Sequence, residues 1–553
     1  MIHEERIHIY QRDFIRKFQS IAAPPPKIPS KWTRIRTGLG DLFREFCANS
    51  TIHGISYIGS KRQSVCEKFW WILVILMSLY GCGNLIDNIY RKWEENPVII
   101  TFDEKHTPVW EIPFPAVTIC PEAKVKKTFL NFTESFYKFA RGNHFSDINN
   151  TELDAVLAVL QLCDEWFHTS AECCKAYDNF KISENIVSIL KKISFNMNET
   201  IYHCQMNGVV CKAKFAQTIT EEGICMTFNG FSSEEMFRKS TLHTDYEYLS
   251  ETRLSTNWSL ERGYYSNANL NSYPIRVLGS GFGAGLYINL ATTNTDLDYH
   301  CREAQGFKVL LHSPSDYPQV SKKFIRVTLN RDVTIAIKPQ IIGTDNELHD
   351  YSPDRRLCFF DRERELKFFH VYSQGNCELE CLTNFTEKTC GCVRYFMPRT
   401  NQTRSCETFE IGCTLKAQIK LLEINAISSI NRQADSEHNC NCLPACNSIQ
   451  YDAEITQTIF KYQETLRLRL GPINVSYEDA IKSKHLSKIE IYFKDVQFIT
   501  SKRTELYGLT DFVASCGGIL GLCMGVSLLS LIELLYFCSI RPLLLVKNTF
   551  QRY

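Results

Sequence analysis

The stretch Gly517-Gly-Ile-Leu-Gly-Leu-Cys-Met-Gly-Val-Ser-Leu-Leu-Ser-Leu-Ile-Glu533 belongs to an uncharged run of 21 residues, Phe512 to Ile532. As a helix, a run of this length crosses the roughly 30 Å hydrocarbon core of a bilayer. It carries glycines at four-residue spacing, Gly517, Gly521 and Gly525, and is followed by a carboxylate, Glu533. A simple lipid anchor needs neither feature, whereas helices that pack together around an aqueous path use both. The stretch therefore predicts a pore-lining transmembrane helix.

A second uncharged run, Phe69 to Ile86, has 18 residues and predicts another span. The residues before it are polar and contain no apolar signal-peptide core, so this run is expected to act as an uncleaved signal anchor. Residues 1–68 carry 12 Lys/Arg against 6 Asp/Glu, and residues 541–553 carry three basic residues and no acidic one. Because positively charged flanks remain in the cytosol, both termini are expected there.

This topology divides a multi-pass plasma-membrane protein into five segments. They are a cytosolic N-terminal segment 1–68, a first transmembrane helix 69–90, an extracellular domain 91–510, a second transmembrane helix 511–540 that forms the pore, and a short cytosolic tail 541–553.

Cysteines and glycosylation sequons support an extracellular location for the middle segment. Of 24 cysteines, 18 lie between the two spans, and an even number in an oxidising compartment predicts disulfides. Pairs such as Cys390/Cys392 also admit a zinc interpretation, but no matching His/Cys partner pattern accompanies them, so we expect no metal and no cofactor. Seven Asn-x-Ser/Thr sequons are expected to be glycosylated: Asn131, Asn149, Asn198, Asn257, Asn384, Asn401 and Asn474.

The extracellular segment is predicted to be mixed α/β. Strand-like runs occur at 114–119, 307–312, 333–337 and 489–493, and helical patterns at about 151–168, 183–195 and 415–430. Two cysteine-bearing strands, 114–120 and 223–229, are candidates for neighbours joined by Cys120 and Cys225. The cysteines concentrated at 358–446 indicate a small helical subdomain that is stapled by disulfides.

Several motifs admit more than one interpretation. The glycine-rich run Gly279-Ser-Gly-Phe-Gly-Ala-Gly285 matches a phosphate loop weakly and is better explained as a turn. The His53-Gly54 pair is either a surface turn or a functional motif, and Glu533 either reaches the membrane interface or belongs to a ring of carboxylates that attracts cations. Walker A, Gly-x-Ser-x-Gly and His-Glu-x-x-His motifs do not occur, so we predict no enzyme and no catalytic residue.

The chain resembles the degenerin/epithelial sodium channel family of trimeric, amiloride-sensitive cation channels. The resemblance is carried, in chain order, by Ser50-Thr-Ile-His-Gly54, Phe114-Pro-Ala-Val-Thr-Ile-Cys120, Gly223-Ile-Cys-Met-Thr-Phe-Asn229, Cys377-x3-Cys381 with Cys390-x-Cys392, Cys440-Asn-Cys-Leu-Pro-Ala-Cys446, and Gly517-Gly through Gly-Val-Ser527 to Glu533. Trp258-Ser-Leu-Glu-Arg-Gly-Tyr264 and the additional cysteines are similar to the arthropod pickpocket branch. The implied fold has two transmembrane helices flanking a large disulfide-rich α/β ectodomain, like that of the acid-sensing channels.

The resemblance implies roles for individual residues. Gly525, Val526 and Ser527 match the selectivity filter, where the helix is broken, and His53 and Gly54 match the gating motif. Ala514 stands at the degenerin position, where a larger side chain hinders closure. Asp511 and Ser515 lie at the outer pore mouth and Glu533 at the inner one.

The resemblance also implies seven disulfides and leaves four cysteines without an assigned partner. The implied pairs are Cys120–Cys225, Cys204–Cys211, Cys358–Cys446, Cys377–Cys442, Cys381–Cys440, Cys390–Cys413 and Cys392–Cys406; the unassigned cysteines are Cys163, Cys173, Cys174 and Cys301.

The chain departs from its relatives at Cys516 and at Cys523, where many of them have an aromatic residue. The tail has no Pro-Pro-x-Tyr motif, so ubiquitin-ligase regulation is not expected, and the carboxylates of a proton-gated acidic pocket have no recognisable counterparts.

We therefore predict a voltage-independent, amiloride-sensitive sodium channel subunit that forms a homo- or heterotrimer and is gated by a mechanical or chemical extracellular stimulus. Its partners are sodium ions, other channel subunits and membrane lipid, with no nucleic acid. The alternative is a non-conducting two-span receptor or accessory subunit.

Overall fold

The computed structural model describes residues 31–95, 98–140, 149–163, 181–246, 258–265, 268, 272–431, 440–470 and 483–544. The chain divides into two compact units. One combines both ends of the chain, Met1–Pro97 and Leu506–Tyr553, and the other is the central segment Val98–Glu505.

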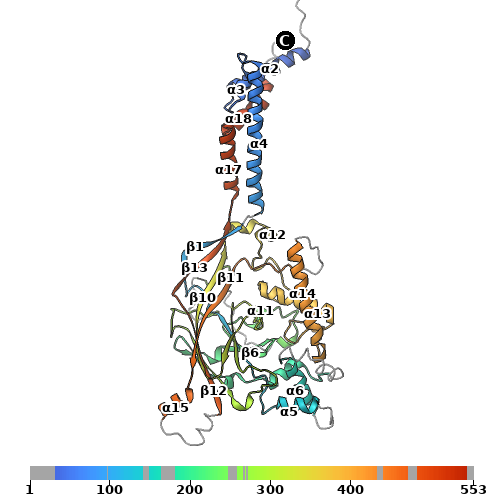
Figure 1. Ribbon diagram of the computed structural model, residues 1–553, viewed down its shortest axis with the longest axis vertical. Helices are drawn as coiled ribbons and strands as arrows, with labels where there is room; N and C mark the ends of the chain where they lie inside the picture. The colour runs from blue at the N-terminus through green and yellow to red at the C-terminus, as the bar shows by residue number, and fades with distance from the viewer. Residues whose placement is uncertain are drawn as a thin grey trace, which may run out of the picture. The chain divides into compact units, whose positions relative to one another are not determined.

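The terminal unit is helical. Its elements are α2 (Lys31–Asn49), α3 (Ile55–Gly59), α4 (Val65–Glu95), α17 (Leu509–Met524), α18 (Leu528–Leu535) and the π-helical turn η7 (Tyr536–Ile540). Helices α4 and α17 lie side by side, although more than 400 residues separate them in the chain (Figure 1). Near the C-terminal end of α4, the Trp93 ring stacks on the Phe512 ring of α17, with 5.4 Å between ring centroids.

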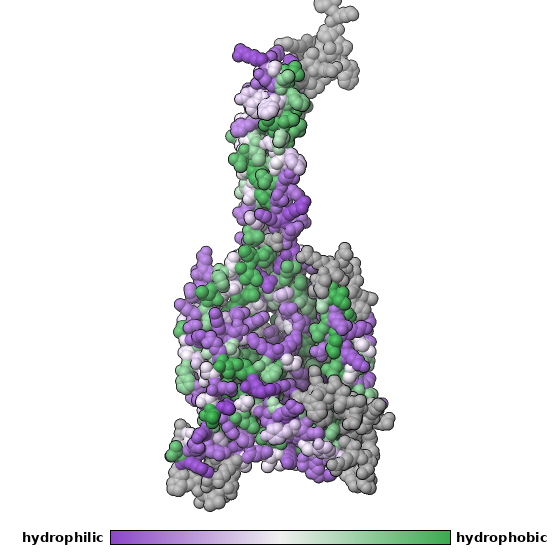
Figure 2. Space-filling model, viewed as in Figure 1, coloured by the Kyte–Doolittle hydropathy of each residue, from purple (hydrophilic) through white to green (hydrophobic). Residues whose placement is uncertain are grey.

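Helices α4, α17 and α18 expose many apolar side chains. Large hydrophobic side chains of α4 and of α17–α18 are exposed, and Figure 2 shows hydrophobic surface along these helices. Among the described residues, α4 is the one helix that is long and apolar enough to cross a bilayer by itself. Helix α17 and the helical stretch Leu528–Leu544 pass the same test only together, as a pair bent by 76°. Exposed apolar surface on this scale is what lipid would cover.

The central unit contains two β-sheets. The larger has eight strands in the order β1-β13-β10-β12-β7-β3-β4, with β11 also paired to β10, and the smaller has the order β5-β6-β2-β8-β9. The strands of the larger sheet are β1 (Val98–Pro108), β3 (Ile201–Met206), β4 (Val209–Val210), β7 (Leu286–Thr293), β10 (Arg331–Thr344), β11 (Ser448–Ile459), β12 (Lys484–Phe493) and β13 (Gln497–Glu505). Those of the smaller sheet are β2 (Ala116–Pro121), β5 (Phe215–Thr220), β6 (Gly223–Phe228), β8 (Gly306–His312) and β9 (Ile325–Thr328).

One hydrophobic core includes side chains from both sheets. Alternate residues of the long strands contribute to it, as Val333, Ile335 and Ile337 do on β10, because successive side chains of a strand point to opposite faces. Strand β2 is buried along nearly its whole length, since it lies in the middle of the smaller sheet. All four strand-like runs that the sequence indicates lie within or overlap strands, namely β2, β8, β10 and β12.

A second core lies among the helices of the central unit. The helices of the central unit are α5 (Phe132–Ala140), α6 (Asn150–Leu160), α9 (Ile186–Ile193), α10 (Met197–Thr200), α11 (Ser233–Met236), α12 (Pro353–Arg356), α13 (Gln374–Cys390), α14 (Ile411–Asn431) and α15 (Tyr462–Leu470). The 3-10 turns are η2 (Lys212–Lys214), η3 (Thr244–Tyr246), η4 (Asn294–Asp296), η5 (Asn346–Asp350) and η6 (Thr408–Glu410). Among the helices, α5, α6, α9, α11 and α13 contribute side chains to this core. Helix α6 ends at Leu160, earlier than the helical pattern 151–168 predicts, and residues 164–168 lie outside the described part of the chain.

Eight disulfides are formed among the described residues. Seven are the pairs that the family resemblance implies, and the eighth joins Cys163 to Cys301, a pairing that the sequence left open. Cys173 and Cys174 lie outside the described residues. Three bridges start from α13, which runs beside α14 (Figure 1), because Cys377, Cys381 and Cys390 all lie on this helix. The bridges fix a helical region with long loops, which would otherwise lose much conformational entropy on folding.

Four of the seven predicted glycosylation asparagines are exposed, namely Asn149, Asn198, Asn384 and Asn401. Asn131 is partly buried and donates a hydrogen bond to Glu134 at 3.0 Å. Asn257 and Asn474 lie outside the described residues.

A buried charge cluster joins the smaller sheet to its flanking loops. The Glu222 carboxylate, in the turn between β5 and β6, lies 2.7 Å from Lys124, 2.7 Å from Lys308 and 3.0 Å from Arg302. Burial by itself would raise the pKa of Glu222, but the three cations outweigh it and lower that pKa. For Lys124 burial dominates over the attraction of Glu222 and lowers the pKa to about 8. One carboxylate therefore compensates three cations.

We expect Glu222→Gln to lower the free energy of unfolding by about 3–5 kcal/mol, because loss of one partner leaves buried charges uncompensated. The melting temperature of the solubilised protein measures this effect. The matched control is Glu234→Gln, which breaks an exposed pair with Lys239 and should cost about 0–1 kcal/mol. Equal melting temperatures for the two variants would contradict the assignment.

Candidate functional site

The pore-lining stretch is interrupted at Gly525-Val526-Ser527, between α17 and α18. Gly525 ends α17 in the left-handed conformation (φ 67°), which a glycine adopts without steric cost, and its N–H still donates to the Gly521 carbonyl at 2.8 Å. Ser527 is extended and begins α18, where its hydroxyl accepts a hydrogen bond from the Ser530 N–H. The break therefore falls on the three residues that the resemblance assigns to a selectivity filter.

The His53-Gly54 segment lies directly against this break. The His53 backbone N–H donates to the Met524 carbonyl at 2.9 Å. A Cβ added to Gly525 would lie 2.6 Å from the His53 imidazole, closer than any real Cβ contact. Glycine is thus required at position 525 by its backbone conformation and by the approach of His53. The structure brings together two motifs that lie more than 450 residues apart.

Gly54 fits closely on the other side of the segment. It has φ 86°, and a Cβ there would lie 3.1 Å from the Ile75 side chain of α4. One turn further, the Tyr57 ring stacks on Trp71 at 4.3 Å between centroids. The segment is therefore held between α4 and the break in α17–α18.

Glu533 takes part in a polar cluster with the same segment. The Thr51 hydroxyl donates to the Glu533 carboxylate at 3.1 Å and lies 2.7 Å from the Ser530 hydroxyl, and the Thr51 N–H also approaches the carboxylate at 3.3 Å. Contacts of this kind fix the carboxylate near the break. Thr51 and Ser530 were not identified as site residues from the sequence, although Thr51 lies inside the motif and Ser530 one helical turn before Glu533.

The other predicted pore residues lie at the opposite end of α17. Asp511 accepts a hydrogen bond from the Gly508 N–H at 3.3 Å and so caps the start of the helix. Ala514 is exposed and Ser515 is partly buried. A Cβ on Gly517 or Gly518 would meet no atom within 4 Å, so the glycine stripe at this end faces open space in the single chain.

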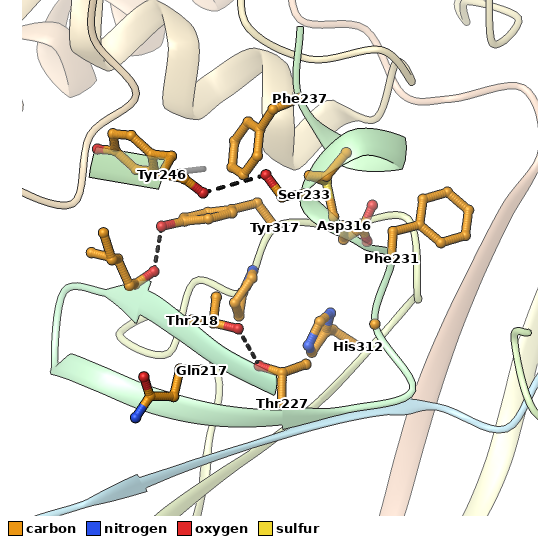
Figure 3. Close-up of a pocket in the computed structure, with 14 residues that line it drawn as sticks. Gln217, Thr218, Thr227, Phe231, Ser233, Phe237, Tyr246, His312, Asp316 and Tyr317 are labelled. Atoms are coloured by element: carbon orange, nitrogen blue, oxygen red, sulfur yellow. Dashed lines mark hydrogen bonds between the residues drawn. The ribbon is translucent and has the colours of Figure 1, made fainter. Parts of the chain in front are cut away.

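A small cavity lies in the central unit between β5, β6, α11 and the end of β8 (Figure 3). It encloses about 50 Å³, which suits one or two water molecules and not an organic ligand. His312 borders it, with Nδ1 2.9 Å from the Ser313 carbonyl and Nε2 2.9 Å from the Thr118 hydroxyl. Because the carbonyl can only accept, Nδ1 carries a hydrogen and donates to it; in a neutral imidazole Nε2 is then an acceptor for the Thr118 hydroxyl.

Burial shifts the pKa values of two groups beside this cavity in opposite directions. Burial lowers the pKa of His312 to about 4 and raises the pKa of Asp316 to about 6. His312 consequently supports the fold only while it is neutral, and Asp316 supports it better when it is protonated.

The chain is similar over most of its length to a family model and to several known proteins. The family model described as "Amiloride-sensitive sodium channel" matches residues 46–537. Pickpocket protein 28 of Drosophila melanogaster is 26% identical over 530 residues, which cover 92% of this chain and 80% of that protein. The sodium channel protein Nach of the same species is 23% identical over 528 residues (93% and 90%). The bile acid-sensitive ion channel of Mus musculus is 22% identical over 525 residues (92% and 91%).

His312 predicts an acid-dependent loss of stability. As the pH falls from about 6.5 through about 4, an unfolded chain binds a proton at this residue before the folded chain does, so stability decreases. His312→Gln retains an acceptor and a donor but cannot titrate. We expect its melting temperature to fall less than that of the unmodified protein between pH 7 and pH 4.

The control for this measurement is His106→Gln, a replacement of an exposed histidine on β1. It should follow the unmodified protein across the same pH range. If His312→Gln also follows it, His312 is not buried as a neutral imidazole.

Proposed function

The chain belongs to the amiloride-sensitive sodium channel family, and on this premise we propose that it is a subunit of a voltage-independent, amiloride-sensitive sodium channel of the plasma membrane. The family model and the relatives support a cation-channel subunit. An extracellular stimulus, mechanical or chemical, gates it. Sodium selectivity, amiloride block and the extracellular stimulus are the parts of the proposal that recordings must test.

The proposed subunit has two spans and cytosolic termini. Its segments are 1–68 in the cytosol, 69–90 and 511–540 in the membrane, 91–510 outside the cell and 541–553 in the cytosol. Support comes from the long apolar α4, from the apolar bent pair formed by α17 and Leu528–Leu544, and from eight disulfides in the central unit. Three subunits are proposed to surround one pore, because a single α17 cannot enclose an aqueous path and its Gly517-Gly518 face meets no neighbour in one chain.

The contact of His53-Gly54 with the break at Gly525 is the observation that carries the proposal. A helix break within an apolar span exposes backbone carbonyls, and such carbonyls can replace the hydration shell of a cation. We assign Gly525, Val526 and Ser527 to the selectivity filter on this ground, and His53 and Gly54 to the support that holds the break in place. Glu533, held by Thr51, adds a carboxylate from each subunit at the inner mouth and raises the local cation concentration.

Gating is proposed to act at the opposite end of α17, near Ala514. A stimulus that rearranges the stapled region 358–446 moves the start of α17, which Asp511 caps, and separates small side chains that close the pore. A bulky residue at position 514 would keep these helices apart. Asp511 and Ser515 then lie at the outer mouth.

We expect Gly525→Ala to reduce the sodium current about tenfold or more, because a left-handed alanine costs about 1–2 kcal/mol and its Cβ also displaces His53. Whole-cell recording with surface biotinylation separates lost conduction from lost delivery. Gly521→Ala is the matched control, since its Cβ would meet only the Val526 carbonyl at 3.8 Å, an ordinary contact. A normal current from Gly525→Ala would refute the role assigned to the break.

Ala514→Val tests the channel assignment itself. When the chain is expressed in oocytes, we expect this variant to give a constitutive sodium current that amiloride blocks, while Ala514→Gly, which removes bulk, should not. Absence of any such current despite surface delivery would favour the non-conducting receptor or accessory subunit. Co-expression with a conducting relative then decides between these two, because an accessory subunit alters the relative's current.

A further inference from the structure

The contact between α4 and α17 contains a hydrogen bond from a side chain to a carbonyl near the break. The Ser78 hydroxyl of α4 donates to the Cys523 carbonyl of α17 at 2.8 Å. Cys82 lies four residues after Ser78, hence one turn along on the same face of α4. Among the described residues of α4 it is the only buried one, with 2% of its surface exposed. Cys82 is therefore enclosed where the two helices meet.

Two further cysteines lie on α17 along this contact. The side chain of Cys82 interacts with those of Cys523 and, more weakly, Cys516, and Cys523 is the residue whose carbonyl accepts from Ser78, one turn before Cys82. Cys516 and Cys523 are seven residues apart, which places them two turns apart on one face of α17. None of the three takes part in a disulfide.

We propose that Cys82 and Cys523 form a dithiol site that captures soft thiophilic reagents able to bond to two thiols at once, specifically trivalent arsenicals of the type R–As=O. In this reaction two As–S bonds form, the oxygen leaves as water with both thiol protons, and no atom is oxidised or reduced. The product is uncharged. A neutral bridge suits an apolar helix contact, where a charged complex would carry a desolvation cost.

The ligand set at this position favours a bridge between two thiols over a zinc site. Zinc in proteins takes four ligands, commonly Cys and His. Within the described part of the chain, no third Cys, His or carboxylate atom completes a group with Cys82 and Cys523 in which all ligand atoms lie within 4.8 Å of one another. Thiolate ligands are preferred by soft acceptors.

A bridge at this position links α4 to α17 immediately before Met524 and Gly525. It therefore fixes the helix contact beside the break against which His53 lies. Binding itself does not depend on conduction, so it can be tested separately from the proposed channel activity.

The test uses the full-length chain in permeabilised membranes. A membrane-impermeant maleimide first blocks thiols exposed to water, and the solubilised protein is then passed over a phenylarsine oxide resin in the presence of a monothiol. We expect the unmodified protein to be retained and to elute with dimercaprol. Cys82→Ser and Cys523→Ser should each reduce retention about tenfold or more, because a single thiol lacks the effective concentration of a pair.

Matched controls are Cys66→Ser and Cys538→Ser, which replace exposed single thiols and should leave retention unchanged. Retention of Cys82→Ser or Cys523→Ser at the level of the unmodified protein would overturn the proposal, as would failure of the unmodified protein to bind. Cys516→Ser distinguishes the pair from its neighbour and should retain binding.

Current recording supplies the second measurement. Phenylarsine oxide should alter the current of Ala514→Val, and neither Cys82→Ser nor Cys523→Ser in that background should respond. Resin binding without any current would leave the dithiol site intact and count against a channel that conducts by itself. A current with no dithiol-dependent retention would refute the dithiol site alone.

Discussion

A helix that is interrupted inside a hydrocarbon layer leaves backbone groups that lipid cannot satisfy, so other parts of the protein must satisfy them. Here the carbonyls that end α17 are paired by three different segments. The Gly525 N–H donates to the Gly521 carbonyl, the Ser78 hydroxyl of α4 donates to the Cys523 carbonyl, and the His53 N–H donates to the Met524 carbonyl. Without these partners the break would be costly, and α17 would gain by continuing as a regular helix. The His53-Gly54 motif thus lies at the end of α17 because it supplies a hydrogen-bond donor to a carbonyl there, although the two segments are far apart in the sequence.

The glycines of the terminal unit are required for different physical reasons at different positions. Gly525 and Gly54 both have positive φ and lie against other side chains; a Cβ would collide with His53 at Gly525 and would be tight against Ile75 at Gly54. Gly517 and Gly518 are surrounded by open space in the single chain, and only a surface outside this chain would explain them as packing residues. The four glycines look alike in sequence, yet two of them are explained by contacts within the chain and two are not.

The central unit is stabilised in a different way. Its two sheets share one apolar core. The helical region 358–446 contributes to a second apolar core and is stapled by disulfides, and at the turn 221–222 the Glu222 carboxylate compensates three cations. Removal of an apolar side chain would cost a fraction of the core energy, whereas removal of Glu222 leaves three neighbouring cations without the carboxylate that compensates them. A few polar and covalent links therefore decide whether the loops around the sheets keep their places.

The sequence alone determined the two apolar segments and the strands at β2, β8, β10 and β12, because length and hydrophobic pattern are local properties. The residues at which α17 breaks came from the family resemblance, since the local pattern predicted one uninterrupted helix. The family resemblance further supplied seven cysteine pairs that local pattern does not give. Only the tertiary structure placed His53 against Gly525 and Thr51 against Glu533, brought Cys82 and Cys523 to the same helix contact, and paired Cys163 with Cys301. These contacts join residues far apart in the chain, and no periodicity records them, since they arise only when helices and loops pack together and each buried polar group finds a partner.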